Sequence, residues 1–508
     1  MKTQFAAGAI SVALLALFIF SNTNGDITVW GDDVWPMGNE LPVHWNYFTH
    51  ANRGFTVPFY RTVFRLNGRN TQHLHVFYFC LFVLSALLFY TLLHKLLGAA
   101  PAAIGSVFYL AYAGKYEIVV WNIAGGYTVC ANVFFLSVLI ALSDRFRPWT
   151  KGAVIAAINW LFLLVYEILI VAAPLYPFLY WLHQRLLRKP VSRRAFAATC
   201  LPLLIFLAHV CVLYFGTPRG EPLPWQRGSS RSAMTLAAAS ARITPVFTSN
   251  VSTAIGSGHF ALLSPQIEIF SKYVPIHATA IVEAAGACAA IAFLLWLAPV
   301  VRPSKAIVVP MAIAGVYLTF LSAMVGVTTF PGFTPSRLLT LTSIGLSLLV
   351  AIAASIALTQ RFAIVRYGVP VLLSAVCGIE AAAMNSIFYQ FQTSWAYDSH
   401  IRTQLLATGI KPQIGDTIFI SLPPNPMDRF WRIGFSNFER GHIQTLLTLD
   451  YGLTLAGTTS PPLLYEHEIR YAGVPPVVPA AQPGHQLFCF SVSDNDYRLT
   501  RTDCPNRH

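Results

Sequence analysis

Residues 75–96 read HVFYFCLFVLSALLFYTLLHKL, an apolar run in which Lys95 is the one formally charged residue. A helix of this length crosses the roughly 30 Å hydrocarbon core of a bilayer at about 1.5 Å per residue. Comparable runs recur as far as residue 388. The 508 residues are 55% hydrophobic and 11% charged, whereas soluble proteins carry about 25% charged residues. The sequence therefore predicts an α-helical polytopic membrane protein.

The apolar runs predict about eleven membrane spans. We expect the first, residues 1–20, to be a retained span, and a cleaved signal peptide is the alternative. The block 153–183 is interrupted by Glu167 and Pro174, which favours an antiparallel pair of helices over a single long bent helix. The other spans are predicted near residues 75–96, 99–113, 128–142, 196–216, 278–301, 306–326, 338–358 and 367–388.

The cations are concentrated in alternate connections between the predicted spans. The net charge of +13 fits cytoplasmic loops that face anionic lipid, and it is poor evidence for nucleic-acid binding. By the positive-inside rule the basic connections are cytoplasmic, so that the loops 21–72 and 217–277 are external. The absence of long disordered tails favours the inner membrane of a bacterium. The basic connections contain Lys95, Arg145, Arg147, Lys151, Arg185, Arg188, Lys189, Arg193, Arg194, Arg302, Lys305, Arg361 and Arg366.

Residues 390–508 differ in composition from the predicted transmembrane domain, residues 1–389. Runs such as TIFISLPP and FCFSV, together with many prolines and glycines, predict a small α/β or β-rich domain. The predicted orientation makes this C-terminal domain extracytoplasmic. Six of the eight cysteines lie in apolar segments, whereas Cys489 and Cys504 lie in polar sequence. These two can form a disulfide if the tail is outside the cytoplasm.

The segment GDDVWPMGNE, residues 31–40, follows the first span and carries adjacent carboxylates on Asp32 and Asp33. Such a pair at the membrane boundary can supply a catalytic base. It can equally be a solvated turn that keeps an external loop in water. Two neighbouring carboxylates also suit Mg²⁺ or Mn²⁺, and the sequence leaves the need for a divalent metal open.

Further ionisable residues are predicted at the same external face. Ionisable side chains at membrane depth are costly and are therefore candidates for function. Arginine binds phosphate through a planar fork of charge-assisted hydrogen bonds. Each candidate also has a structural alternative, since Glu167 can cap a helix and Arg337 can extend to the lipid headgroups. The candidates are Glu117 and Glu167 as catalytic carboxylates, and Arg337, Arg219, Arg227 and Lys115 as phosphate-binding cations.

Several motifs resemble those of a known group of membrane enzymes in their order and spacing. VYEILIVAAPL, residues 165–175, stands where that family has SKE…VLPL, and PSRLLTLTSIGLSLLVAIA, residues 335–353, resembles its ERYLYLPSIGFCLLLA. The blocks at 57–98 and 108–142 resemble two further family blocks in the same order. Together with the acidic first loop, they resemble the GT-C glycosyltransferase superfamily, closest to its protein O-mannosyltransferase-like branch, over roughly residues 1–390.

The resemblance implies an integral-membrane, inverting hexosyltransferase that uses a polyprenyl-phosphate sugar as its donor substrate. Asp32 or Asp33 matches the family's first-loop acid, Glu117 its "VE" acid, Glu167 its "SKE" acid and Arg337 its "ER" arginine. The chain departs from the family's pattern at Tyr112, Ala113, Gly126 and Tyr166. These departures leave open the sugar and the acceptor, which can be an envelope glycan, a lipid or a protein.

Two other classes of protein remain open. A transporter or flippase of lipid-linked glycans would place its polar residues in clefts near the middle of the membrane, often in a repeated half. Here the candidates cluster at one predicted face and no repeat is visible, which favours the enzyme. A noncatalytic membrane assembly protein would use the C-terminal tail as its binding module.

Overall fold

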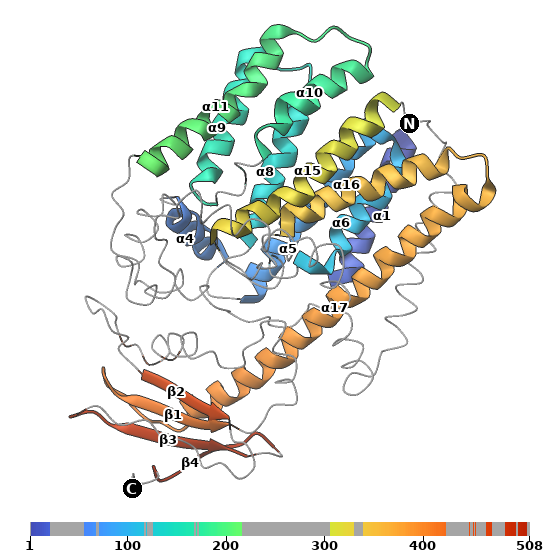
Figure 1. Cartoon of the computed structure of the whole chain (residues 1–508). Helices are drawn as coiled ribbons and strands as arrows, with labels where there is room; N and C mark the ends of the chain where they lie inside the picture. Colours follow the sequence, from blue (N-terminus) through green and yellow to red (C-terminus); the bar gives the residue numbers. More distant parts are fainter. Residues whose placement is uncertain are drawn as a thin grey trace.

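The computed structural model of the chain consists of a bundle of helices and a small β-sheet (Figure 1). The predicted span 278–301 and the predicted loop 217–277 lie outside the residues that the structure describes. The described residues are 2–20, 55–67, 71–115, 118, 125–166, 169, 172–215, 305–329, 339–422, 447, 451, 453, 464–469, 483–493 and 496–504.

The helices form where the apolar runs lie, because a chain in lipid must satisfy its backbone hydrogen bonds within the same segment. Within the described residues, three helices are long and apolar enough to cross a membrane: Gln72–Leu97, Gly125–Leu142 and Leu339–Leu358. They support a helical membrane protein, while the count of about eleven spans stays a prediction. The helices are α1 (Lys2–Phe20), α4 (Thr56–Asn67), α5 (Thr71–Leu97), α6 (Ala99–Ala111), η3 (Ala113–Lys115), α8 (Gly125–Leu142), α9 (Pro148–Leu163), α10 (Leu175–Leu186), α11 (Arg193–Phe215), α15 (Lys305–Thr329), α16 (Leu339–Leu358) and α17 (Ala363–Ala407).

The apolar block 153–183 forms two helices and not a single bent one, since α9 ends at Leu163 and α10 begins at Leu175. A buried polar network joins both helices to α8. Asn159 donates a hydrogen bond to the Ser137 hydroxyl (2.9 Å), and the Tyr176 hydroxyl donates to the Asn159 side-chain oxygen (2.6 Å). Such side-chain hydrogen bonds between apolar helices contribute about 0.6 kcal/mol each on average.

Helix α16 packs closely against α15 on one side and α6 on the other. A Cβ atom at Gly345 would lie 2.5 Å from the Gly315 carbonyl oxygen and 2.6 Å from the Thr319 backbone nitrogen. A Cβ atom at Gly105 of α6 would lie 2.9 Å from the Ser347 carbonyl oxygen. Glycine is therefore required at both contacts, because any side chain would separate the helices. Small residues serve this purpose at helix interfaces in membranes.

Two of the basic connections lie together at one end of the bundle. Lys189, between α10 and α11, donates a hydrogen bond to Asp144, between α8 and α9, at 3.1 Å. This hydrogen bond is the main reason that the pKa of the Asp144 carboxyl is held below its usual range. His183 interacts electrostatically with Lys95, which brings the α5–α6 connection to the same end.

The α16–α17 connection lies at this end as well. Gly105 of α6 lies against Ala351 of α16, whereas Lys115, beyond the end of α6, lies against Ser343 near the start of α16. The two helices therefore run antiparallel, and the end of α16 lies beside the start of α6. Lys115 and Ser343 consequently lie toward the end of the bundle opposite the basic connections.

A four-stranded sheet follows the bundle in sequence. Its order is β2-β1-β3-β4, with β1 parallel to both β2 and β3, and β3 antiparallel to β4. β1 occupies an inner position and is buried along its whole length, which its apolar sequence TIFISL favours. A disulfide joins Cys489 of β3 to Cys504. The strands are β1 (Thr417–Leu422), β2 (Leu464–Ile469), β3 (Leu487–Val492) and β4 (Leu499–Arg501).

Helix α17 connects the bundle to the sheet and is far longer than the predicted span 367–388. Its 45 residues correspond to about 68 Å, more than twice the thickness of a bilayer core. The predicted domain boundary at residue 389 falls within this helix. At its far end Ile401 and Leu405 pack in the core of the sheet. Gln404 accepts a hydrogen bond from the Leu499 N–H (2.8 Å) and donates one to the Tyr497 carbonyl oxygen (2.9 Å).

The contact at Gly345 predicts a specific loss of stability. Gly345→Ala should lower the free energy of unfolding by about 1–3 kcal/mol, because the new methyl group meets backbone atoms that cannot rotate away. Gly368→Ala is the matched control, since its Cβ would find only Ile364 Cγ2, at 4.0 Å. Thermal unfolding of the detergent-solubilised chain measures both. Equal melting temperatures for the two variants would contradict the close packing of α15 and α16.

Candidate functional site

The structure describes one of the predicted site residues, Lys115. The predicted catalytic and phosphate-binding residues that lie outside the described part of the chain are Asp32, Asp33, Glu117, Glu167, Arg219, Arg227 and Arg337.

Lys115 ends the short helix η3, directly beyond α6, and its side chain has no exposed surface. Its ammonium group donates hydrogen bonds to the backbone oxygen of Tyr109 and, at 3.5 Å, to the Ser343 hydroxyl. It also lies over the aromatic rings of Tyr109 (3.4 Å to the centroid) and Phe82 (4.8 Å). Such contacts stabilise a desolvated cation by about 2 kcal/mol or more. The phosphate-binding role of Lys115 stays a prediction.

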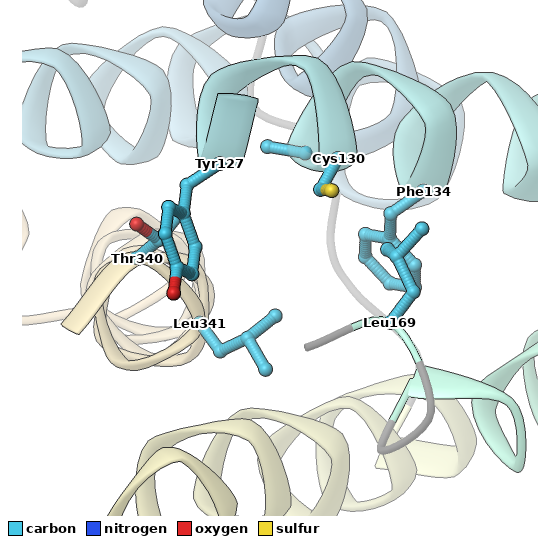
Figure 2. Close-up of a pocket in the computed structure, with 7 residues that line it drawn as sticks. Tyr127, Cys130, Phe134, Leu169, Thr340 and Leu341 are labelled. Atoms are coloured by element: carbon cyan, nitrogen blue, oxygen red, sulfur yellow. The ribbon is translucent and has the colours of Figure 1, made fainter. Parts of the chain in front are cut away.

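A small cavity lies near the same turn of α16 (Figure 2). It has about 10 Å³ of space for the centre of a water molecule, which is enough for about one water. Tyr127 descends from the first turn of α8 beside Thr340 of α16. The lining residues are Tyr127, Cys130, Ala131, Phe134, Leu169, Thr340 and Leu341. The cavity thus brings together three segments that are distant in sequence.

Three tyrosines extend from the cavity to α4. The ring of Tyr127 lies 4.2 Å from the ring of Tyr166, measured between centroids. The Tyr166 hydroxyl forms a hydrogen bond of 2.8 Å with the Tyr60 hydroxyl. The start of α4 is held there as well, because the Thr56 hydroxyl donates to the Val165 carbonyl oxygen at 3.1 Å. These residues form a buried tyrosine cluster consisting of Tyr60, Tyr127 and Tyr166.

The tyrosine cluster was not predicted from the sequence, in which Tyr166 and Gly126 are only departures from the GT-C pattern. In the structure these two residues lie together, since a Cβ at Gly126 would come within 2.5 Å of the Tyr166 ring and of the Tyr60 hydroxyl. A larger residue at position 126 therefore excludes the observed position of Tyr166. The departures from the GT-C pattern at Gly126 and Tyr166 are therefore the feature of the sequence from which this contact could have been predicted.

The described part of the chain contains no group of three or more His, Cys, Asp or Glu side chains that could hold a metal ion. Asp32 and Asp33, the predicted candidates for metal binding, lie outside that part.

Comparisons with models of protein families, with curated proteins and with solved structures found no match to this chain. The resemblance to GT-C glycosyltransferases is consequently a hypothesis that depends on the motifs in the sequence.

The tyrosine cluster predicts coupling between two hydroxyl groups. Tyr60→Phe and Tyr166→Phe should each lower the free energy of unfolding by about 0.5–1.5 kcal/mol, and the double variant should lower it by less than the sum. Thermal unfolding measures this double-mutant cycle. Tyr90→Phe combined with Tyr166→Phe is the control and should be additive, because the Tyr90 hydroxyl donates to the Phe5 carbonyl oxygen instead (3.3 Å). Additivity in the Tyr60–Tyr166 cycle would rule out the hydrogen bond.

Proposed function

We propose that this chain is a GT-C-like glycosyltransferase of the membrane, which moves a hexose from a polyprenyl-phosphate donor to an acceptor hydroxyl. The observation that carries the proposal is the position of the first turns of α16. Ser343 contacts Lys115, and Thr340 lines the cavity that also contains Leu169. The segments that bear the predicted charged residues therefore approach one another at one end of the bundle.

Three described residues close in sequence to the predicted charged residues belong to the same region. Leu169 is two residues from Glu167 in sequence, Ile118 is next to Glu117, and Thr340 is three residues from Arg337. Ile118 and Leu169 are both buried in the main core, and Thr340 lines the same cavity as Leu169. These neighbours support the proposal that the two carboxylates and the guanidinium act together.

Two independent features support an external location for this end. The basic connections cluster at the opposite end, and the positive-inside rule makes that end cytoplasmic. The tail that follows α17 contains the Cys489–Cys504 disulfide, and disulfides persist in oxidising compartments such as the periplasm. Both features favour a periplasmic or other external active site.

The proposed reaction is a single displacement with inversion. The acceptor oxygen attacks the anomeric carbon and forms the new glycosidic bond, while the bond from that carbon to the phosphate oxygen breaks. Asp32 or Asp33 accepts the hydroxyl proton as general base. The leaving polyprenyl phosphate keeps the electron pair, and Arg337, with Arg219 or Arg227, stabilises its charge. Glu117 and Glu167 orient the acceptor or the base.

A transporter of lipid-linked glycans is the second candidate. The observation that favours it is the burial of Lys115 together with Glu380, whose side chain is 6% exposed, among apolar helices. Buried ionisable residues of this kind also mark transport pathways. A transporter moves the labelled lipid across the membrane without forming a new glycosidic bond, so the product distinguishes the two functions.

The proposed base predicts the result of conservative substitutions. Asp32→Asn or Asp33→Asn, whichever removes the base, should slow transfer by about 10²–10⁴-fold with normal expression. The assay supplies membranes with radiolabelled polyprenyl-phosphate mannose, or the glucose analogue, and measures label in the acceptor fraction.

Asp144→Asn is the matched control, since Asp144 is a solvent-exposed aspartate at the opposite end of the bundle, where an ion pair contributes little. This control should transfer at the wild-type rate. The proposed mechanism is wrong if both Asp32→Asn and Asp33→Asn also do so.

A further inference from the structure

Two connections at one end of the bundle are strongly basic. They join α8 to α9 and α10 to α11, and residues 143–151 and 184–194 together contain eight Lys and Arg residues but a single acid, Asp144. In Figure 1 the α10–α11 connection lies on the far side of the bundle from the sheet. Cations gathered in one place repel one another and attract anions. This end of the bundle is therefore suited to bind an anionic partner.

The two connections are held against each other by direct contacts. Lys151, in the first turn of α9, is 3% exposed, and its ammonium group donates a hydrogen bond to the Ala141 carbonyl oxygen at the end of α8 (3.0 Å). The same ammonium group lies 5.4 Å from the ring centroid of Tyr180 on α10. Asp144 and Lys189 then join the two connections at 3.1 Å. These two charges neutralise each other, so the accessible positive charge in excess belongs to the arginines.

Four exposed arginines lie within four residues of this ion pair in sequence, two on each connection. Within the described part of the chain, none of the four forms an ion pair with a carboxylate. A guanidinium binds phosphate oxygens through its planar fork of donors, so the group fits a phosphate as its counter-charge. The four residues are Arg145, Arg147, Arg185 and Arg188.

Arg188 stands at a backbone position that favours glycine. Its φ is +55°, in the left-handed region that residues with a Cβ rarely adopt. The turn ends α10, because the Arg188 N–H donates to the Arg185 carbonyl oxygen (3.1 Å) and the Lys189 N–H to the Gln184 carbonyl oxygen (2.9 Å). Glycine is the usual residue at this place in such a turn. The Arg188 side chain can therefore be removed without disturbing the turn.

Exposed apolar side chains accompany the arginines in the same two segments. They are Phe146, Trp149 and Leu187. Tryptophan is enriched where a membrane protein meets the headgroup region, and the positive-inside rule makes this end cytoplasmic, where anionic lipids are concentrated. A lipid would cover both the arginines and these apolar side chains, whereas a soluble anion would leave the apolar side chains in water. The combination therefore favours a lipid.

We infer that Arg145, Arg147, Arg185 and Arg188 form a binding site for the headgroup phosphate of an anionic phospholipid. The site lies at the end of the bundle opposite the proposed site of sugar transfer, and the inference is independent of that reaction. Basic surfaces between helices on the cytoplasmic side bind anionic headgroups in this way. A defined site predicts saturable binding that depends on these arginines, whereas diffuse attraction would depend equally on any exposed cation at this end.

Native mass spectrometry of the full chain in neutral detergent tests the site, with phosphatidylglycerol as the anionic probe and phosphatidylcholine as the zwitterionic one. The wild type should bind phosphatidylglycerol about tenfold or more tightly than phosphatidylcholine, and Arg188→Gly should weaken phosphatidylglycerol binding by about fivefold. Its melting temperature should equal or exceed that of the wild type, because glycine adopts this φ without strain. The preference should be lost in the quadruple variant Arg145→Gln/Arg147→Gln/Arg185→Gln/Arg188→Gly.

Arg361→Gln is the matched control, since it removes an exposed cation from the α16–α17 connection at the same end. It should leave the affinity for phosphatidylglycerol within about twofold of the wild type, because Arg361 is outside the proposed site. An equal loss in Arg361→Gln and Arg188→Gly would indicate diffuse attraction and would overturn the site. Equal affinity of the wild type for the two lipids would overturn it as well.

Two further arms keep the test decisive. Arg145→Gln, in the connection between α8 and α9, should repeat the loss seen with Arg188→Gly, and it replaces that variant if the glycine lowers the melting temperature. Glycerol 3-phosphate, which has the phosphate without acyl chains, should bind about tenfold or more weakly than phosphatidylglycerol, because it cannot cover the apolar side chains. Equal binding of the two would make this a site for a soluble anion and would overturn the assignment to a lipid.

Discussion

The close approach of α16 to α15 and α6 is the contact on which the rest of the structure depends. Helices in lipid gain little from the hydrophobic effect when they associate, so tight packing of small residues and interhelical hydrogen bonds must hold them together. Gly345 and Gly105 allow this approach on the two sides of α16. The Thr342 hydroxyl adds a hydrogen bond to the Thr319 carbonyl oxygen at 3.3 Å. Through this packing the first turns of α16 reach both Lys115 and the cavity near Leu169.

The apolar runs were sufficient to predict a helical membrane protein, because length and composition determine whether a segment can cross a bilayer. They also favoured the division of 153–183, which the helix ends at Leu163 and Leu175 confirm. The extent of α17 was not predictable from them. Beyond residue 388 its sequence is polar, and the helix continues to the sheet, where Ile401 and Leu405 are buried. The sequence also did not predict which helices pack against one another, since every face of an apolar helix has a similar composition.

The candidate site was predicted only as a set of residue types. Lys115 was identified as an ionisable residue near the membrane boundary, but its contact with Ser343 joins positions 228 residues apart, and no local pattern encodes such a pair. Its burial against Tyr109 followed from the structure alone. The tyrosine cluster coincides with two unusual positions in the sequence, because Gly126 and Tyr166 both depart from the GT-C pattern. The acids of the first loop and Arg337 stay predictions from motif and topology.

The central claim is that charged segments distant in sequence meet at the external end of the bundle, beside the start of α16. Cysteine cross-linking of Glu167→Cys with Arg337→Cys, in a chain whose cysteines outside the disulfide are replaced by serine, tests it most directly. Leu169→Cys with Thr340→Cys serves as the positive control, because both residues line one cavity. The account predicts that a short bifunctional thiol reagent joins positions 167 and 337 and that a membrane-impermeant reagent reaches both from outside. Labelling of the two positions from opposite sides of the membrane, or no cross-link where the control forms one, would contradict the account.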